Sequence, residues 1–160
     1  MKRIVIGLLV LASLSGFACA AESPNSKLTV TAAGERVGSF AGSKDLAVKF
    51  WLQQLALSAL YSNDVESATS ADWERAASFP SKIHCVYPTD SHIGLPERQL
   101  LTFDEIVVPI ADKGYPDFIY LKHDESYFRL AKYDPWLFWK LKAEAGLAEK
   151  VPDTIARALF

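Results

Sequence analysis

Apolar residues recur every three to four positions between residues 43 and 61, and this spacing places them on one face of an α-helix. The Ser43 hydroxyl can accept a hydrogen bond from a free backbone N–H, and Asp45 lies in the first turn, where the helix dipole favours an acid. We therefore predict a helix over residues 43–61 that forms the spine of the core. Its apolar face comprises Val48, Trp51, Leu52, Leu55 and Ala59, widened by Phe50, Leu57 and Leu60.

Further along the chain the pattern changes to the alternation of apolar and polar residues that is typical of strands. We predict a strand over residues 82–87 and a second over residues 98–110, irregular near Asp104 and Glu105. Between them, residues 88–97 contain a glycine and two prolines and are expected to form a loop.

Residues 117–133 contain two alternating segments joined at residues 123–126, which predicts a hairpin. A two-residue and a four-residue connection give the same register, and a slip of one residue would exchange the two faces. One face is aliphatic apart from a phenylalanine and should meet the long helix; it comprises Ile119, Leu121, Phe128 and Leu130. The other face combines tyrosines with cations and should be partly wet; it comprises Tyr120, Lys122, Tyr127 and Arg129, with Phe118 and Ala131 beside them.

Three shorter helices complete the predicted elements. Residues 72–79 form one, which Pro80 ends. Asp134 and Pro135 open the next with an acidic N-cap and a proline at the first helical position, and Gly146 closes it. A last helix covers residues 152–159. This order predicts the α+β class: an antiparallel sheet, a meander with a C-terminal hairpin, packed against a long N-terminal helix, with two further C-terminal helices.

The N-terminus has the pattern of an export signal, because Lys2 and Arg3 precede a short apolar run. That run is shorter than the about 20 residues that span a bilayer. Cleavage after Ala20 divides the chain into three parts. These are a signal peptide at 1–20, a segment at 21–43 with a tether, a short strand over 27–31 and a loop, and a single α+β domain at 44–160. The protein is therefore expected in the periplasm or secreted; the alternative is a lipoprotein anchored through Cys19.

Removal of the signal takes away Lys2 and Arg3, so the formal charge goes from −2 to −4. An acidic domain is a poor partner for a phosphate backbone, and we expect no nucleic-acid binding and no transmembrane segment. Cys85 is then the remaining cysteine. No intramolecular disulfide can form, and a packed core must supply the stability.

Candidate catalytic and metal-binding groups are weakly supported by their spacing. Cys85 and His84 are neighbours on a predicted strand, so their side chains diverge, and we interpret Cys85 as a buried structural residue. No Gly-x-Ser-x-Gly motif is present, and we predict no catalytic residue. The possible zinc ligands His84, Asp90, His92 and His123 share only the local spacing Asp90-x-His92, so we predict no metal site and no cofactor.

Aromatic residues are dense over residues 115–139, and Tyr and Arg are typical of protein interfaces. We predict that Tyr120, Lys122, Tyr127 and Arg129 form a binding surface. The leading hypothesis is a non-enzymatic periplasmic protein that binds a partner protein in the cell envelope, as an inhibitor or accessory protein.

Two alternatives remain open, as does the oligomeric state. The first is a small-molecule or glycan-binding domain with a pocket between helix and sheet, lined by tryptophans. The second is a cell-wall hydrolase that uses carboxylates, for which Asp104 and Glu105 could pair with Asp124 and Glu125. Convergence of Glu105 with His84 or Asp124 in a cleft would favour this second alternative.

Overall fold

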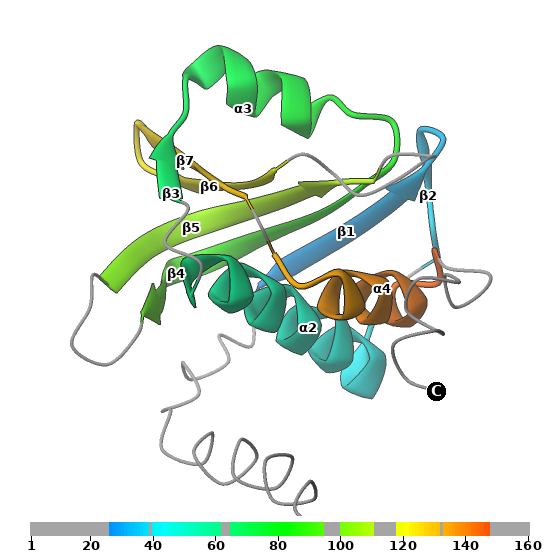
Figure 1. Ribbon diagram of the computed structural model, residues 1–160. Coiled ribbons are helices and arrows are strands. Elements are labelled where there is room, and N and C mark those ends of the chain that lie inside the picture. Colours follow the sequence, from blue (N-terminus) through cyan, green and yellow to red (C-terminus); the bar gives the residue numbers. More distant parts are fainter. Residues whose placement is uncertain are drawn as a thin grey trace, which may run out of the picture.

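Over the residues that the structure describes, the fold is one antiparallel seven-stranded sheet with helices on both faces, in the order β2-β1-β4-β5-β6-β7-β3 (Figure 1). A computed structural model describes residues 26–38, 40–61, 65–94, 100–110, 118–131 and 133–147. The strands are β1 (Lys27–Ala32), β2 (Glu35–Arg36), β3 (Val65–Ser67), β4 (Lys82–Gly94), β5 (Leu100–Pro109), β6 (Ile119–His123) and β7 (Ser126–Leu130), and the helices are α2 (Gly42–Tyr61), α3 (Ser70–Ala77) and α4 (Pro135–Glu144). The predicted α+β class is confirmed, whereas the export signal and the helix over 152–159 lie outside the described residues.

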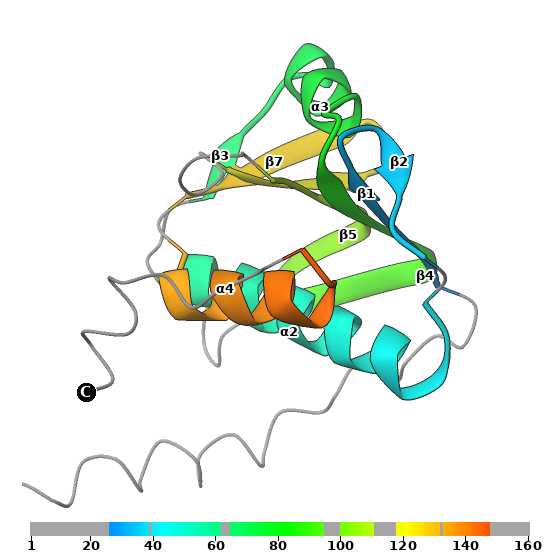
Figure 2. The ribbon, with the colours of Figure 1, turned by 90° about the vertical axis from the view of Figure 1, so that its right-hand side faces the viewer.

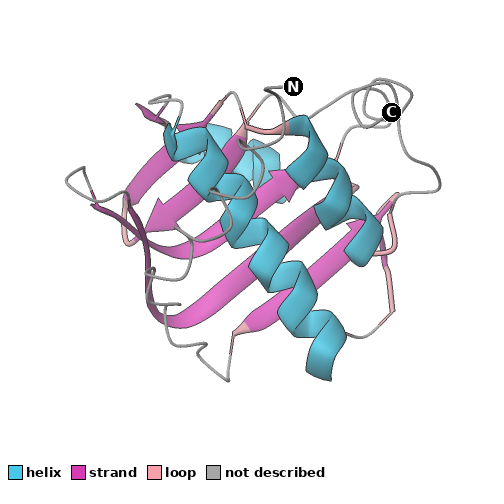
Figure 3. Cartoon of the chain, turned by 60° about the horizontal axis from the view of Figure 1, so that its bottom comes forward, coloured by secondary structure: helices cyan, strands magenta, loops and turns pink. Residues whose placement is uncertain are grey.

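The helices form two unequal layers. The long helix α2 and the shorter α4 lie side by side across one face of the sheet, as Figure 3 shows. The opposite face carries α3, which contacts β5 and β6 (Figure 2). None of the described helices has the length and apolar character needed to cross a membrane.

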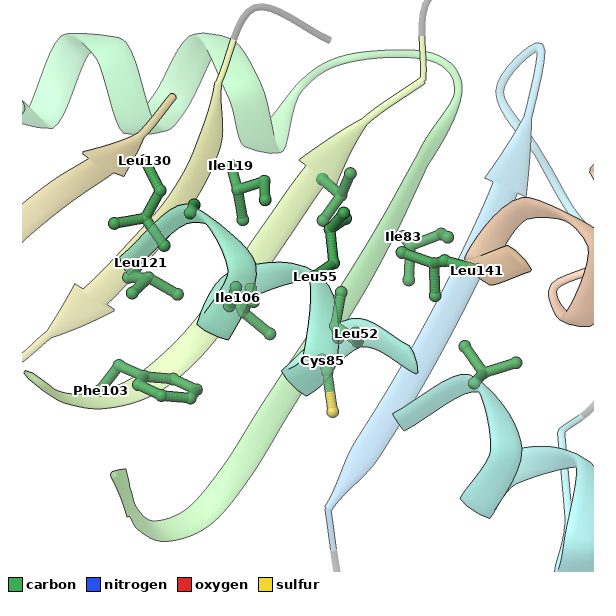
Figure 4. Close-up of a cluster of buried hydrophobic side chains, with 14 of the residues drawn as sticks. Leu52, Leu55, Ile83, Cys85, Phe103, Ile106, Ile119, Leu121, Leu130 and Leu141 are labelled. Carbon is green, nitrogen blue, oxygen red and sulfur yellow. The ribbon is translucent and has the colours of Figure 1, made fainter. Parts of the chain in front are cut away.

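The main core lies between α2 and the sheet, and its side chains fill that space (Figure 4). Leu52 and Leu55 of α2 are fully buried in this core. The sheet contributes Ile83, Cys85, Phe103, Ile106, Ile119, Leu121 and Leu130, none of them more than 1% exposed. The predicted burial of Cys85 is therefore confirmed, and the thiol behaves as a small apolar group.

The predicted hairpin register is also confirmed. Ile119 pairs with Leu130 and Leu121 with Phe128 across β6 and β7. The two-residue connection is Asp124-Glu125, and Asp124 adopts the left-handed conformation with φ of 51°. An aspartate tolerates that conformation better than most residues. The hairpin therefore turns its aliphatic face toward the main core, as expected.

Local capping explains where the shorter helices begin and end. Asp134 accepts a hydrogen bond from the Trp136 backbone N–H at the start of α4, and Gly146 follows its end with a φ of 75°. Helix α3 begins at Ser70, two residues before its predicted start. Thr69 and Asp72 form a reciprocal capping box there, which satisfies two backbone donors that would otherwise lack partners.

The prediction of a loop over residues 88–97 was wrong for most of its length. Strand β4 continues to Gly94, and its pairing with β5 shifts register between Val86 and Ser91. Such a bulge leaves residues outside the ladder, and Pro88 lies within it, where a missing N–H removes no ladder hydrogen bond. The irregularity that was predicted near Asp104 lies opposite this bulge.

Two short edge strands were not predicted. Strand β2 follows a turn at Ala33 and Gly34, which both have positive φ, and lies in the segment expected to be a loop. Strand β3 pairs with β7 at the other edge of the sheet. Both are too short to show alternation in the sequence.

Candidate functional site

The predicted binding surface lies on the sheet face that carries α3. Tyr120, Lys122, Tyr127 and Arg129 all point away from the main core, as expected, and all four are half-buried. Helix α3 covers part of this face, where Trp73 and Ala76 pack on Val107 with Tyr120 and Tyr127 beside them. The surface is thus partly occupied by the protein's own helix, and a second, smaller core forms beneath it.

A polar cluster on three neighbouring strands borders this smaller core. His84 Nε2 of β4 lies 2.9 Å from Glu105 Oε2 of β5, and Lys122 Nζ of β6 donates to Glu105 Oε1 at 2.5 Å. The Trp73 ring lies beside them, with its centroid 6.2 Å from that of His84 and 5.9 Å from Lys122 Nζ. We call His84, Glu105, Lys122 and Trp73 the Glu105 cluster.

The pKa values of Glu105 and Lys122 are shifted in the directions that keep both side chains charged. Burial by itself would raise the pKa of Glu105, but the hydrogen bonds and charges of Lys122 and His84 outweigh it and hold that pKa below its ordinary value. The hydrogen bond to Glu105 raises the pKa of Lys122, against a smaller opposing effect of burial. Glu105 is therefore ionised at neutral pH, which suits an ion pair or a base and does not suit a general acid.

Arg129 is held by a separate pair at the edge of the sheet. Its Nε and Nη2 donate to Glu66 Oε2 at 2.7 and 2.6 Å, and its guanidinium lies 4.5 Å from the centroid of the Phe118 ring. Tyr127 packs against Trp73 at 6.1 Å between centroids. The charged groups of the predicted binding surface thus have partners within the chain.

The possible metal ligands do not converge as one set. His84 contacts Glu105, and His92 Nδ1 lies 3.0 Å from Thr102 Oγ1. His123 instead gathers carboxylates: its Nδ1 lies 3.7 Å from Asp90 Oδ1, and donor atoms of Asp104, His123 and Asp124 lie within 4.8 Å of one another.

This second group offers one imidazole nitrogen and two carboxylates, which are donor types that zinc takes. Asp104 Oδ1 and His123 Nδ1 are buried without a hydrogen-bond partner. However, the Asp124 side chain is 84% exposed, and acids gathered at an exposed turn are common without an ion. The group therefore does not by itself assign a metal site.

Nucleophilic catalysis by Cys85 finds no support in this arrangement. The thiol lies in the main core, on the opposite side of β4 from His84. Burial raises the pKa of the Cys85 thiol to about 11, so the reactive thiolate is scarce at neutral pH.

The most exposed apolar side chains lie elsewhere, on the outer side of α2. Leu46 is 42% exposed, Phe50 47% and Tyr61 57%, and the remaining large exposed apolar residue among those described is Phe79, at 36% beyond the end of α3. We define the α2 outer face as the positions at helical spacing on this side that do not pack against the main core: Leu46, Phe50, Gln54 and Tyr61.

The sequence analysis missed this face because it assigned Phe50 to a wider core stripe, whereas the same assignment was correct for Leu57, which packs against the main core. The available signal was the spacing of four and eleven residues between Leu46, Phe50 and Tyr61, which places them on one side of the helix. Apolar residues all round a helix indicate contacts on both sides.

No protein-family profile, curated protein or solved structure matches this chain.

Proposed function

We propose that this chain is a non-enzymatic exported protein that binds a partner protein through the α2 outer face. One observation carries the proposal: three of the four large apolar residues that are most exposed in the described chain lie on one side of one helix. That side carries no charged residue. Protein interfaces are enriched in aromatic residues and depleted of charge at their centre, whereas an ordinary solvent-facing helix surface is rich in charge.

The size of the exposed area supports a contact of useful strength. A Phe or Tyr side chain presents about 150–250 Å², so the exposed parts of Phe50 and Tyr61 together amount to about 200 Å². At about 25 cal/mol per Å², their burial contributes about 5 kcal/mol before the costs of association are subtracted. A partner with an apolar, uncharged helix or strand surface would fit.

The hairpin surface of Tyr120, Lys122, Tyr127 and Arg129 remains a prediction. A partner at that surface would compete with contacts that Lys122 and Arg129 already make to Glu105 and Glu66. The α2 outer face requires no such exchange. A pocket between helix and sheet is the less favoured alternative, because apolar side chains pack the space between α2 and the strands (Figure 4).

Capture from an envelope extract tests the proposal when it is combined with matched variants. The protein is purified from cells that express the full chain, and bound proteins are identified after a salt wash. We expect one stoichiometric partner that Phe50→Glu loses and Phe79→Glu retains, since both variants add the same charge at an exposed phenylalanine. A partner that binds Phe50→Glu as well as the wild type would contradict the α2 contact.

A second candidate function is hydrolysis of cell-wall material, which the contact between His84 and Glu105 favours. A carboxylate that orients a histidine is a recurrent device for a general base. The salt bridge from Lys122 is equally compatible with a structural ion pair. Release of soluble fragments from purified cell wall by the wild type, lost in Glu105→Gln while the fold is retained, would establish the activity; no release by the wild type would exclude it.

A further inference from the structure

Helix α3 is attached to the sheet by few apolar contacts. The buried residues described for the smaller core are Trp73 and Ala76 of α3 and Val107 of β5. The helix is 8 residues long, and a helix shorter than about 12 residues is marginal by itself in water. Helix α3 therefore depends on the polar contacts that surround these few apolar ones.

One carboxylate fixes the start of the helix. Asp72 Oδ2 accepts hydrogen bonds from the Thr69 backbone N–H at 3.0 Å and from the Thr69 hydroxyl at 2.7 Å. These bonds lower the pKa of the Asp72 carboxyl, and the charge of Arg129 adds to the effect. Protonation would weaken both bonds and remove the negative charge that the N-terminal end of a helix favours.

A second carboxylate lies beneath the helix, in the Glu105 cluster. Glu105 is bonded to Lys122 and to His84, and both of these lie beside the ring of Trp73, which anchors α3. In acid a histidine carries a positive charge. Protonation of Glu105 would leave Lys122 and a charged His84 on either side of a neutral group, where the two cations repel one another next to the Trp73 ring.

The other charged groups around α3 act on its two ends differently. Arg129 lies near Asp72 and is paired with Glu66 on β3, the strand that leads into α3. At the opposite end Lys82 Nζ donates to the Ala77 carbonyl, a contact that contains no carboxylate. Acid therefore weakens the N-terminal attachment and leaves the C-terminal one. The remaining charged neighbours are Glu74 and Arg75 on the helix itself and Asp104 beside Lys122.

The other helical layer lacks this sensitivity. Helix α2 meets the sheet through a large set of buried apolar side chains, and burial of apolar area does not depend on pH. The ion pair described on α2, between Asp45 and Lys49, lies within the helix and does not join it to the sheet. Acid should thus loosen α3 before α2.

We propose that α3 is an acid-released cover: protonation of Asp72 and Glu105 detaches its N-terminal end from the sheet and uncovers Tyr120 and Tyr127, while α2 stays in place. Figure 2 shows α3 standing over this face of the sheet. Release would expose the hairpin surface that the helix partly occupies. The inference uses no residue of the α2 outer face and is independent of the proposed function.

The direction of the pH effect follows from the two carboxyl groups. The folded pKa values of Asp72 and Glu105 both lie below their ordinary values. Their stabilisation is therefore complete above the unfolded values, about 3.9 for an aspartate and about 4.3 for a glutamate, and is lost as the pH falls through the folded pKa values. Release is expected below about pH 4.

Hydrogen exchange on the full chain tests the proposal. Protection factors, corrected for the pH dependence of the intrinsic exchange rate, are measured at about pH 7 and about pH 3. We expect protection in α3 to fall at least about tenfold more than protection in α2, because a local opening exposes only the segment that detaches.

Matched variants separate the two carboxylates from acid in general. The double variant Asp72→Asn with Glu105→Gln is neutral at both positions at every pH, so it should show at pH 7 the low α3 protection that the wild type shows only in acid. Glu74→Gln makes the same kind of change at an exposed position of the same helix and should behave as the wild type does. Far-UV circular dichroism verifies that both variants are folded.

Three results would overturn the inference. These are wild-type α3 that keeps its protection at pH 3, protection lost equally in α2 and α3, and a folded double variant with normal α3 protection at pH 7. If the double variant does not fold, the comparison of α3 with α2 in the wild type decides. Capture through the α2 outer face at neutral pH is unaffected by any of these outcomes, so the two proposals fail separately.

Discussion

The two faces of the sheet differ in how they are covered. Toward α2 and α4 the sheet presents a continuous set of apolar side chains, almost all of them fully buried. Toward α3 a small apolar group around Trp73 and Val107 is bordered by ion pairs from Glu105 and Arg129. The first face depends on packing alone, whereas the second depends on packing together with charge.

This difference indicates separate roles. The large apolar face determines whether the chain folds, because burial of apolar area is the dominant favourable term. The face beneath α3 fixes the position of one short helix. Its contribution to the free energy of unfolding changes with pH as its carboxylates titrate. A contact surface is therefore best placed where neither set of interactions is used, and the α2 outer face meets that condition.

The comparison is tested most strongly by a substitution that creates a cavity in the main core. Phe103 is fully buried on β5, and Phe103→Ala should lower the free energy of unfolding by about 4 kcal/mol. Chemical denaturation measures the change. A loss below about 1 kcal/mol would show that this face is less tightly packed than the burial indicates.

The smaller core should respond less and more locally. Trp73→Ala removes the side chain that joins α3 to the sheet, and we expect a loss of about 3 kcal/mol, at the lower end for a buried tryptophan. Hydrogen exchange should accelerate in α3 and remain unchanged in α2. Equal acceleration in both helices would mean that the two layers unfold as one unit.

Glu105→Gln should cost about 1 kcal/mol at neutral pH, because it leaves Lys122 and His84 with a neutral partner at a partly exposed site. The folded pKa of Glu105 lies below its unfolded value of about 4.3. Its stabilisation is therefore complete above that value and is lost as the pH falls through the folded pKa. Denaturation at several pH values should show the wild type and variant converging in acid; a constant difference would contradict this linkage.

The smallest effect is expected at the sheet edge. Glu66 is 48% exposed and Arg129 33%, so Glu66→Gln should change stability by about 0.5 kcal/mol or less. The same denaturation measurements serve as the check. A loss as large as that of Glu105→Gln would show that the edge pair contributes as much as the more buried one.

Much of the fold could be predicted from local signals. Asp134, Pro135 and Gly146 marked α4, and the alternation over the hairpin fixed which residues face the main core. These signals are short-range and act within one element. The continuation of β4 beyond Val86 could not be predicted, because a bulge interrupts the alternation and Pro88 is typical of loops.

The candidate site was harder to predict. Periodicity correctly placed Tyr120, Lys122, Tyr127 and Arg129 on one face, but it could not show that α3 packs on that face or that Glu105 and Glu66 supply partner charges. Long-range packing decides such contacts. Likewise, Phe50 fitted a wide core stripe, and only the placement of α2 on the sheet shows that its side of the helix stays exposed.

The most direct test of the account compares the two candidate surfaces in one association experiment. Phe50→Glu and the double variant Tyr120→Ala with Arg129→Ala are measured beside the wild type by capture from an envelope extract, after equal melting behaviour has been verified. The account predicts that Phe50→Glu abolishes association and that the double variant retains it. Association lost only in the double variant would contradict the account and place the contact on the hairpin face.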